Sequence, residues 1–126
     1  MKMILVDTSV WVAHFRSGNT LLAELLELDN VLIHPVVVAE IACGTPPDRR
    51  ATLSSLGLLQ QTQQASLTEV MHFIEREKLY GMGCGIVDMV LLASTLVTPG
   101  AQLWTLDKRL AALANRFDVQ YTTVLR

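Results

Sequence analysis

The hydrophobic residues of this chain form short uninterrupted runs that alternate with longer stretches of helical spacing. The runs Met3-Ile4-Leu5-Val6 and Val31-Leu32-Ile33 are typical of strands buried on both faces. Leucines three and four positions apart between residues 21 and 28, with Glu24 and Glu27 among them, are typical of an amphipathic helix. Along the chain, the pattern predicts strands at 3–6, 31–33, 58–59, 103–106 and 119–123, and helices at 21–28, 35–43, 48–56, 66–80, 86–97 and 108–115.

Local signals support several of these helices. Pro35 fits the first turn of one helix, although the β-branched run at 36–38 argues against a helix there. Ser66 and Glu69 resemble a capping box at the start of another. The glycine-rich segment 81–85 then breaks the chain before an almost wholly apolar helix.

The alternation of strands and helices predicts an α/β fold with a central parallel sheet flanked by helices. At 126 residues the chain is long enough for one hydrophobic core, so we expect a single domain over residues 1–126. In such sheets, ligands bind beyond the carboxyl ends of the strands. Asp7 and Asp107 fall at two predicted strand ends, so a functional site is expected there.

Four acidic side chains lie at the end of, or inside, otherwise apolar segments. They are Asp7, Glu40, Asp88 and Asp107. A carboxylate removed from water without a partner is strongly disfavoured, or its pKa shifts until it is neutral. One shared divalent cation would compensate all four, because hard cations are held by carboxylate oxygens. Mg²⁺ or Mn²⁺ held in this way orients a phosphodiester and lowers the pKa of a bound water, so the predicted chemistry is phosphodiester hydrolysis.

Each acid also has an ordinary structural interpretation. Asp7 could cap a helix that begins near Ser9, and Asp107 could cap the helix that follows it. Asp88 could stabilise the first turn of its helix, where the macrodipole favours negative charge. No cation lies three or four positions from Glu40 or Asp88, so a local salt bridge explains neither. The functional interpretation is therefore strongest for Asp88 and weakest for Asp107.

Composition and charge narrow the class of protein. Apolar residues make up 51% of the chain and charged residues 17%, which excludes a disordered protein. The net charge of −2 gives no general cationic field, so nucleic-acid contact would need a local group of Lys and Arg. Cys43 and Cys84 match neither a metal motif nor a disulfide framework, and we expect buried or half-buried thiols. Without a signal peptide or membrane span in the sequence, we expect a soluble cytoplasmic protein.

No other catalytic motif competes with the acids. The chain has no Gly-x-Ser-x-Gly elbow and no Walker or dinucleotide-binding glycine loop. His14, His34 and His72 lack zinc-ligand spacing. His34 follows a predicted strand near the expected site, but a structural histidine is the better interpretation.

Four segments give the chain a resemblance to a known family. They are Ile4-Leu5-Val6-Asp7-Thr8-Ser9-Val10-Trp11, Val38-Ala39-Glu40-Ile41, Gly85-Ile86-Val87-Asp88 and Thr105-Leu106-Asp107-Lys108-Arg109-Leu110. In order and interval they resemble the PIN-domain ribonucleases of the VapC type, the toxins of bacterial and archaeal toxin–antitoxin pairs. The resemblance covers essentially the whole chain and implies one PIN domain with a three-layer fold. Each segment alone is weak evidence, whereas four in order are specific.

The resemblance implies an endoribonuclease that depends on one or two Mg²⁺ or Mn²⁺ ions. It matches the four acids to the family's acidic quartet, with Asp7 and Asp88 as direct metal ligands. Glu40 and Asp107 would then act through water or through the second ion. Family members are typically homodimers that a cognate antitoxin neutralises, with its C-terminal segment in the active-site groove.

Further residues follow from the same resemblance or from charge. Ser9 and Thr105 match small hydroxyl residues that orient the acidic cluster. For RNA contact, the plausible local cations also include Arg49 and Arg50, and the candidates are Arg16, Lys108 and Arg109, because phosphate contacts are made by Lys and Arg. A scattered solvated surface is an equally good interpretation of these three.

Two other functions are compatible with the pattern. A signalling receiver domain would need an acidic pair after the first strand, where Thr8 follows Asp7, and an Asp after the third strand, where Gln60 and Gln61 stand. A PIN-like binding module would regulate by protein contact alone, using for example the leucine-rich helix at 21–28. It would be indifferent to loss of all four acids.

Overall fold

The computed structural model describes residues 2–122 of the chain. Strands and helices alternate as the sequence predicts. The elements in order are β1 (Met3–Val6), α1 (Thr8–Ser17), α2 (Thr20–Glu27), β2 (Val31–Ile33), α3 (Pro35–Ala42), α4 (Arg49–Gly57), β3 (Gln60–Gln61), α5 (Leu67–Glu77), α6 (Ile86–Val97), β4 (Ala101–Trp104) and α7 (Lys108–Arg116).

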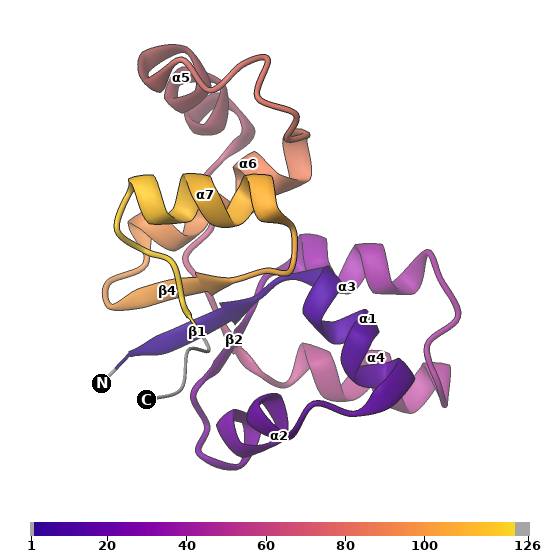
Figure 1. Ribbon diagram of the computed structural model, residues 1–126. Coiled ribbons are helices and arrows are strands. Elements are labelled where there is room, and N and C mark those ends of the chain that lie inside the picture. The colour runs from indigo at the N-terminus through magenta and orange to yellow at the C-terminus, as the bar shows by residue number, and fades with distance from the viewer. Residues whose placement is uncertain (1, 123–126) are drawn as a thin grey trace.

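The four strands form one parallel sheet in the order β3-β2-β1-β4. From β1 the chain adds β2 and then β3 in one direction, and it returns to place β4 on the other side of β1 (Figure 1). This reversal makes the carboxyl ends of β1 and β4 a topological switch point. In open parallel sheets, that is where ligands bind.

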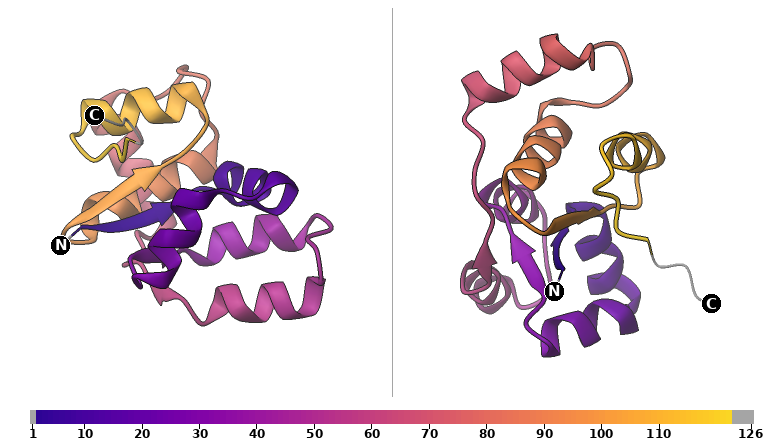
Figure 2. Two further views of the ribbon diagram at one scale, coloured as in Figure 1. Left: turned by 60° about the horizontal axis from the view of Figure 1, so that its bottom comes forward. Right: turned by 90° about the vertical axis from the view of Figure 1, so that its left-hand side faces the viewer.

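Helices cover the sheet on both sides, which confirms the predicted α/β architecture. Figure 1 shows α6 and α7 on one side of the strands and α1, α2 and α4 on the other. Right-handed crossovers give this division, because β4 is reached in the direction opposite to β2 and β3. Helix α5 lies beyond α6, farthest from the sheet (Figure 2). The core between the layers contains fully buried side chains, among them Leu5, Leu22, Leu32, Ile33, Leu91, Leu92 and Leu103.

Two helix starts are fixed by the residues that the sequence singled out. The capping box of α5 is formed: the Glu69 N–H donates to Ser66 Oγ at 3.1 Å, and the Ser66 N–H donates to Glu69 Oε1 at 2.7 Å. At α3, Pro35 occupies the first turn and the Val36 N–H donates to His34 Nδ1 at 3.0 Å. Burial lowers the pKa of His34, so this histidine is a neutral helix cap.

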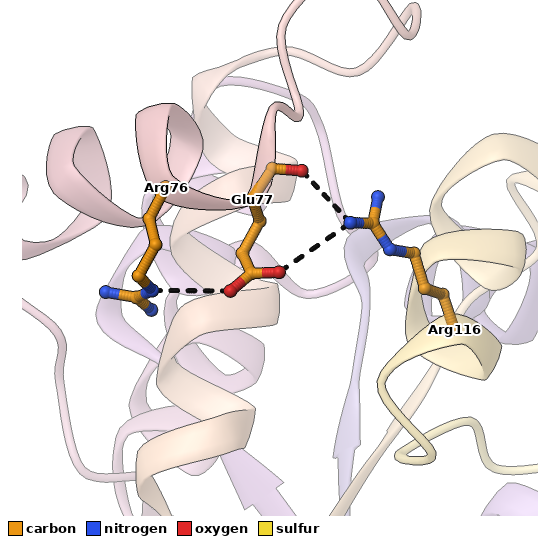
Figure 3. Close-up of polar contacts among 3 residues, drawn as sticks. All are labelled: Arg76, Glu77 and Arg116. Carbon is orange, nitrogen blue, oxygen red and sulfur yellow. Dashed lines mark hydrogen bonds and ion pairs between the residues drawn. The ribbon is translucent and has the colours of Figure 1, made fainter.

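Arg116 joins the end of α7 to the end of α5 (Figure 3). Its Nη2 donates to the Glu77 carbonyl at 3.0 Å and lies 3.6 Å from the Glu77 carboxylate. Arg76 approaches the same carboxylate at 3.3 Å. Exposed ion pairs of this kind add little stability. They do join the end of α7 to the end of α5, from which the chain continues to the glycine-rich segment 81–85.

Three predicted strands differ from the structure. The third was expected at 58–59, but Leu58 ends α4 and is 85% exposed, and the sheet pairs with Gln60–Gln61 instead. The fourth was expected at 103–106, but its ladder with β1 runs over 101–104, so Leu106 lies outside it and is exposed. Strand pairing, which local hydrophobicity does not encode, determines both positions.

The predicted last strand at 119–123 is reduced to one bridge between Gln120 and Leu103. Tyr121 N donates to the Leu103 carbonyl at 2.9 Å, so the chain runs briefly beside β4. Thr123, the end of that prediction, lies outside the described residues.

The two cysteines are both free thiols. Cys84 is half-buried as expected, but Cys43 is exposed because it lies just past the end of α3, so the prediction of a buried or half-buried thiol is wrong there. Among the described helices, none has both the length and the apolar character that crossing a lipid bilayer requires.

Candidate active site

Asp7 lies at the switch point, and two hydroxyl groups hold its carboxylate. Ser9 Oγ donates to Asp7 Oδ2 at 2.7 Å, and Thr105 Oγ1 donates to the same oxygen at 2.8 Å. Ser9 belongs to the first turn of α1 and Thr105 directly follows β4, so the pairing of β1 with β4 brings the three side chains together. Asp7 is only 7% exposed, and these bonds satisfy a carboxylate that burial would otherwise disfavour.

The backbone fixes the direction of both hydroxyl bonds. The Leu106 N–H donates to Ser9 Oγ, and the Asp107 N–H donates to Thr105 Oγ1, each at 3.0 Å. A hydroxyl has a single proton, so a hydroxyl that accepts from the backbone directs its own proton to Asp7. Both hydroxyls use Oδ2, and within residues 2–122 no hydrogen bond involves Asp7 Oδ1. The carboxylate is therefore held in place with one oxygen left for a ligand.

Glu40 reaches the same region from α3. Its Oε1 accepts a hydrogen bond from Thr8 Oγ1 at 2.6 Å, and Thr8 stands between Asp7 and Ser9. No functional role for Thr8 was predicted from the sequence. Its position next to Asp7, in the first turn of a helix, is the only signal that could have indicated one. Glu40 itself is exposed and contributes to the wall of a cavity of about 380 Å³.

Asp88 stands in the first turn of α6, where its Oδ2 accepts from the Gly85 N–H at 3.3 Å. Burial is the largest cause that raises the pKa of Asp88 above its ordinary value. The Gly85 hydrogen bond opposes this change, and the negative charges of Asp7, Asp107 and Glu40 raise the pKa further. Asp88 thus lies in the first turn of its helix, as the structural interpretation predicts. This position does not explain its unfavourable electrostatic environment.

Asp107 is the N-cap residue of α7. Its Oδ1 accepts from the Arg109 N–H at 2.8 Å and from the Leu110 N–H at 3.0 Å. The capping interpretation of Asp107 is confirmed, and its other oxygen takes no part in the cap. Asp107 and Glu40 are both exposed, so the expectation that all four acids are removed from water is wrong for these two. They lie at helix surfaces around a site in which only Asp7 is buried.

Three of the acids act on the fourth. The charges of Asp7, Asp107 and Glu40 add to the effect of burial on the pKa of Asp88, so the three lie within electrostatic reach of it. Within residues 2–122, no three His, Cys, Asp or Glu side chains form a ready-made metal cage. Mg²⁺ usually keeps several waters and is bound by one or two carboxylates together with substrate phosphates. The donor chemistry therefore fits Mg²⁺ or Mn²⁺ better than a metal that needs a closed cage.

Two of the three candidate cations stand beside these acids. Arg16, near the end of α1, lines the same cavity as Glu40. Arg109, in the first turn of α7, exerts its charge on Cys84, whose pKa is also affected by Asp88 and Asp107. Lys108 is exposed, and no side-chain hydrogen bond or ion pair within the described part of the chain involves it.

Comparison with known proteins agrees with this geometry. The PIN domain model matches residues 4–116, a range that contains all four acids. The chain is 44% identical over 110 residues to Ribonuclease VapC32 of Mycobacterium tuberculosis, in strain CDC 1551 / Oshkosh and in strain ATCC 25618 / H37Rv. The alignment covers 87% of this chain and 89% of each relative. A receiver domain is not compatible with these matches. The chain belongs to the PIN-domain family, among its VapC-type members.

Proposed function

We propose that this chain is a metal-dependent endoribonuclease and the toxin of a toxin–antitoxin pair. The relatives at 44% identity are named ribonucleases, and their similarity extends over 87% of this chain. The observation that carries the proposal is the arrangement at the switch point, where Ser9 and Thr105 hold one oxygen of the buried Asp7 carboxylate and leave the other uncommitted. Asp7, Asp107 and Glu40 are also close enough to Asp88 to add to the rise in its pKa that burial causes. A site of that kind attracts a divalent ion and, through the ion, a phosphodiester.

The residues that would hold the ion are Asp7 and Asp88, with Glu40 and Asp107 acting through water or a second ion. When bound, Mg²⁺ or Mn²⁺ would supply charge neutralisation, Lewis acidity toward the phosphodiester and a lowered pKa for water at the site. Asp7 offers the oxygen that its hydroxyl partners leave uncommitted. Asp88 would gain most from the ion, because burial above all, and also the charges of the other three acids, disfavour its ionised form.

The remaining residues of the site orient these acids. Ser9 and Thr105 fix the Asp7 carboxylate, and Thr8 orients Glu40. The site lies where the strand order reverses, so its parts come from separate segments that only the folded sheet brings together. Such positioning matters in hydrolysis because a reacting group must be held close to its attack geometry.

The proposed partners are RNA, a cognate antitoxin and a second copy of this chain. Arg16, Lys108 and Arg109 are the candidate contacts for the RNA backbone, in keeping with the phosphate chemistry of Lys and Arg. The cavity that Arg16 and Glu40 share with Val12 and Phe15 combines apolar and charged walls. Such a cavity suits an antitoxin segment that carries both an apolar side chain and a cation. The proposed homodimer would operate in the cytoplasm.

The test is cleavage of end-labelled total cellular RNA by antitoxin-free protein, with Mg²⁺, with Mn²⁺ and with a chelator. An Asp88→Asn protein purified in the same way controls for contaminating nuclease. We expect discrete metal-dependent fragments from the wild-type protein alone, and mapping their ends identifies the target. Equal cleavage by the two proteins, or no cleavage by folded wild-type protein with metal present, would favour the PIN-like binding module instead.

A further inference from the structure

The guanidinium group of Arg109 lies directly on the backbone of Gly83. A Cβ atom built on Gly83 would stand 2.8 Å from Arg109 Cδ, 2.8 Å from Nη1 and 3.0 Å from Cζ. Two of these separations are shorter than real Cβ contacts, so a side chain at Gly83 would displace Arg109 from this place. The backbone at Gly83 also has φ of 81°, which glycine adopts without strain.

This contact places a cation at the edge of the acidic cluster. Cys84, the residue after Gly83, is close enough to Arg109 for the guanidinium charge to lower the pKa of its thiol. Burial and the charges of Asp88 and Asp107 raise the same pKa. The positive charge of Arg109 and two of the four acids therefore surround one side chain.

Arg109 is nevertheless not neutralised by these acids. The ion pairs within residues 2–122 join Glu77 to Arg76 and to Arg116, and none involves Arg109. Arg109 is exposed, and its backbone N–H, not its side chain, bonds to Asp107. The guanidinium thus packs against Gly83 while its donors remain open to solvent.

The segment that supports Arg109 is anchored at both ends. At its start, Leu79 is buried and its N–H donates to the Ile74 carbonyl at 3.0 Å. At its end, the Gly85 N–H donates to Asp88. Gly83, against which Arg109 packs, thus lies between two anchored points, the second of them at the start of α6.

We propose that Arg109 contacts the RNA backbone phosphate next to the acidic cluster, and that Gly83 is the positioning residue for its guanidinium. The proposal rests on the ribonuclease function, which it deepens. A polyanion that approaches four carboxylates is repelled unless a cation receives it. A guanidinium presents parallel N–H donors that match two phosphate oxygens, and a support that fixes its plane preserves that match.

Two glycines of the same loop make a matched pair of variants. Gly81 has φ of 73°, close to the value at Gly83, but no atom lies within 4 Å of a Cβ built on it. Gly81→Ala and Gly83→Ala therefore carry similar backbone strain, while only Gly83→Ala pushes Arg109 aside. Lys2→Ala, at the opposite end of β1, controls for the loss of one positive charge.

The experiment measures RNA binding and cleavage for these variants and for Arg109→Ala, Arg109→Lys and the double variant Gly83→Ala/Arg109→Ala. Binding is measured with single-stranded RNA in an Asp88→Asn background at several salt concentrations, and kcat/KM in the active background. We expect Arg109→Ala and Gly83→Ala each to lower affinity about 10-fold, and Arg109→Ala to flatten the log–log salt slope by about 0.7. Gly81→Ala and Lys2→Ala should stay within about twofold, and Arg109→Lys should recover part of the affinity.

The double variant should be no worse than Arg109→Ala, because the two changes remove one interaction. Equal losses for Gly83→Ala and Gly81→Ala, or a loss for Arg109→Ala no larger than for Lys2→Ala, would overturn the proposal. If the proposed ribonuclease function is wrong, the wild-type protein itself does not cleave RNA, and this result is distinct from the outcomes above. The binding measurements then still decide whether Arg109 and Gly83 act together on RNA.

Discussion

The two acids expected to bind the metal directly are supported in opposite ways. Asp7, at the end of β1, receives two hydroxyl hydrogen bonds whose direction the backbone fixes. Asp88, at the start of α6, receives one backbone hydrogen bond of 3.3 Å, while burial and three other acids raise its pKa. The sheet thus holds Asp7 in a fixed position, whereas the ionised form of Asp88 is electrostatically disfavoured.

This difference indicates that Asp7 and Asp88 have separate roles in the site. A carboxylate that is already satisfied provides a fixed reference position for a ligand. A carboxylate that repels its neighbours provides the driving force for cation binding, because the ion removes that repulsion. The comparison therefore predicts that changes at Asp7 act mainly on geometry, whereas changes at Asp88 act mainly on charge.

The largest expected effect is on cleavage. Asp7→Asn and Asp88→Asn should each lower kcat/KM for RNA by about 1,000-fold or more, because either change removes a charge from a proposed ligand of the metal. Cleavage of a labelled RNA under single-turnover conditions measures this. Glu75→Gln, an exposed acid on α5, is the control with the same charge change. If Asp88→Asn retained activity, Asp88 on α6 would have no role in the proposed site.

The second effect concerns the hydroxyl support of Asp7. Thr105→Val deletes the donor to Asp7 and leaves the Asp107 N–H without its acceptor, so we expect a loss of activity of 10- to 100-fold and of stability by about 1–2 kcal/mol. Denaturant unfolding and steady-state kinetics provide the two measurements. Thr68→Val on the exposed surface of α5 is the matched control. Full activity in Thr105→Val would mean that Asp7 needs no prearrangement.

A smaller effect is expected where the support is exposed. Thr8→Val removes the single hydrogen bond that orients Glu40. Since Glu40 is exposed and would act through water, we expect only about a threefold loss of kcat/KM and little change in stability. A loss as large as that of Thr105→Val would place Glu40 among the direct metal ligands.

The smallest effect is on the stability of the metal-free protein. The pKa of Asp88 is higher in the folded protein than in the unfolded chain. Between the two values the folded state binds more protons, so the free energy of unfolding falls as pH rises through that window. Asp88→Asn removes this loss and should stabilise the metal-free protein at neutral pH by about 0.5 kcal/mol after solvent screening, or about 2 °C in Tm.

Thermal unfolding in the presence of a chelator measures this change in stability. It is recorded at neutral pH and at a pH below the ordinary pKa of an Asp side chain. The gain should vanish at the lower pH, where Asp88 is protonated in both states. A destabilised Asp88→Asn protein at neutral pH would mean that the bond from the Gly85 N–H outweighs the repulsion.

The sequence predicts the four acids and most helices because these depend on local patterns. Asp7 follows a short apolar run, and Ser66 and Glu69 carry their capping box within four residues. Convergence of the acids depends on strand order. The sequence placed Asp7 at a strand end but contained no signal that β4 lies beside β1, which is what brings Thr105 to Asp7.

Two further features could not be read from the chain. β3 is set by pairing with β2 and contains only Gln60 and Gln61, so it has no hydrophobic pattern to detect. The contact of Arg109 with Gly83 joins residues from two separate elements. In the sequence, Gly83 is one of three alternating glycines, and only the folded backbone distinguishes it from Gly81.

The most direct test of the account is calorimetric titration of Mn²⁺ into the wild-type protein and into Asp88→Asn, with unfolding followed on the same samples. We expect the wild-type protein to bind the ion, to release protons more strongly at lower pH, and to gain thermal stability. Asp88→Asn should bind at least about 10-fold more weakly and gain little. Equal Mn²⁺ affinity in the two proteins would contradict the claim that repulsion at Asp88 drives assembly of the site.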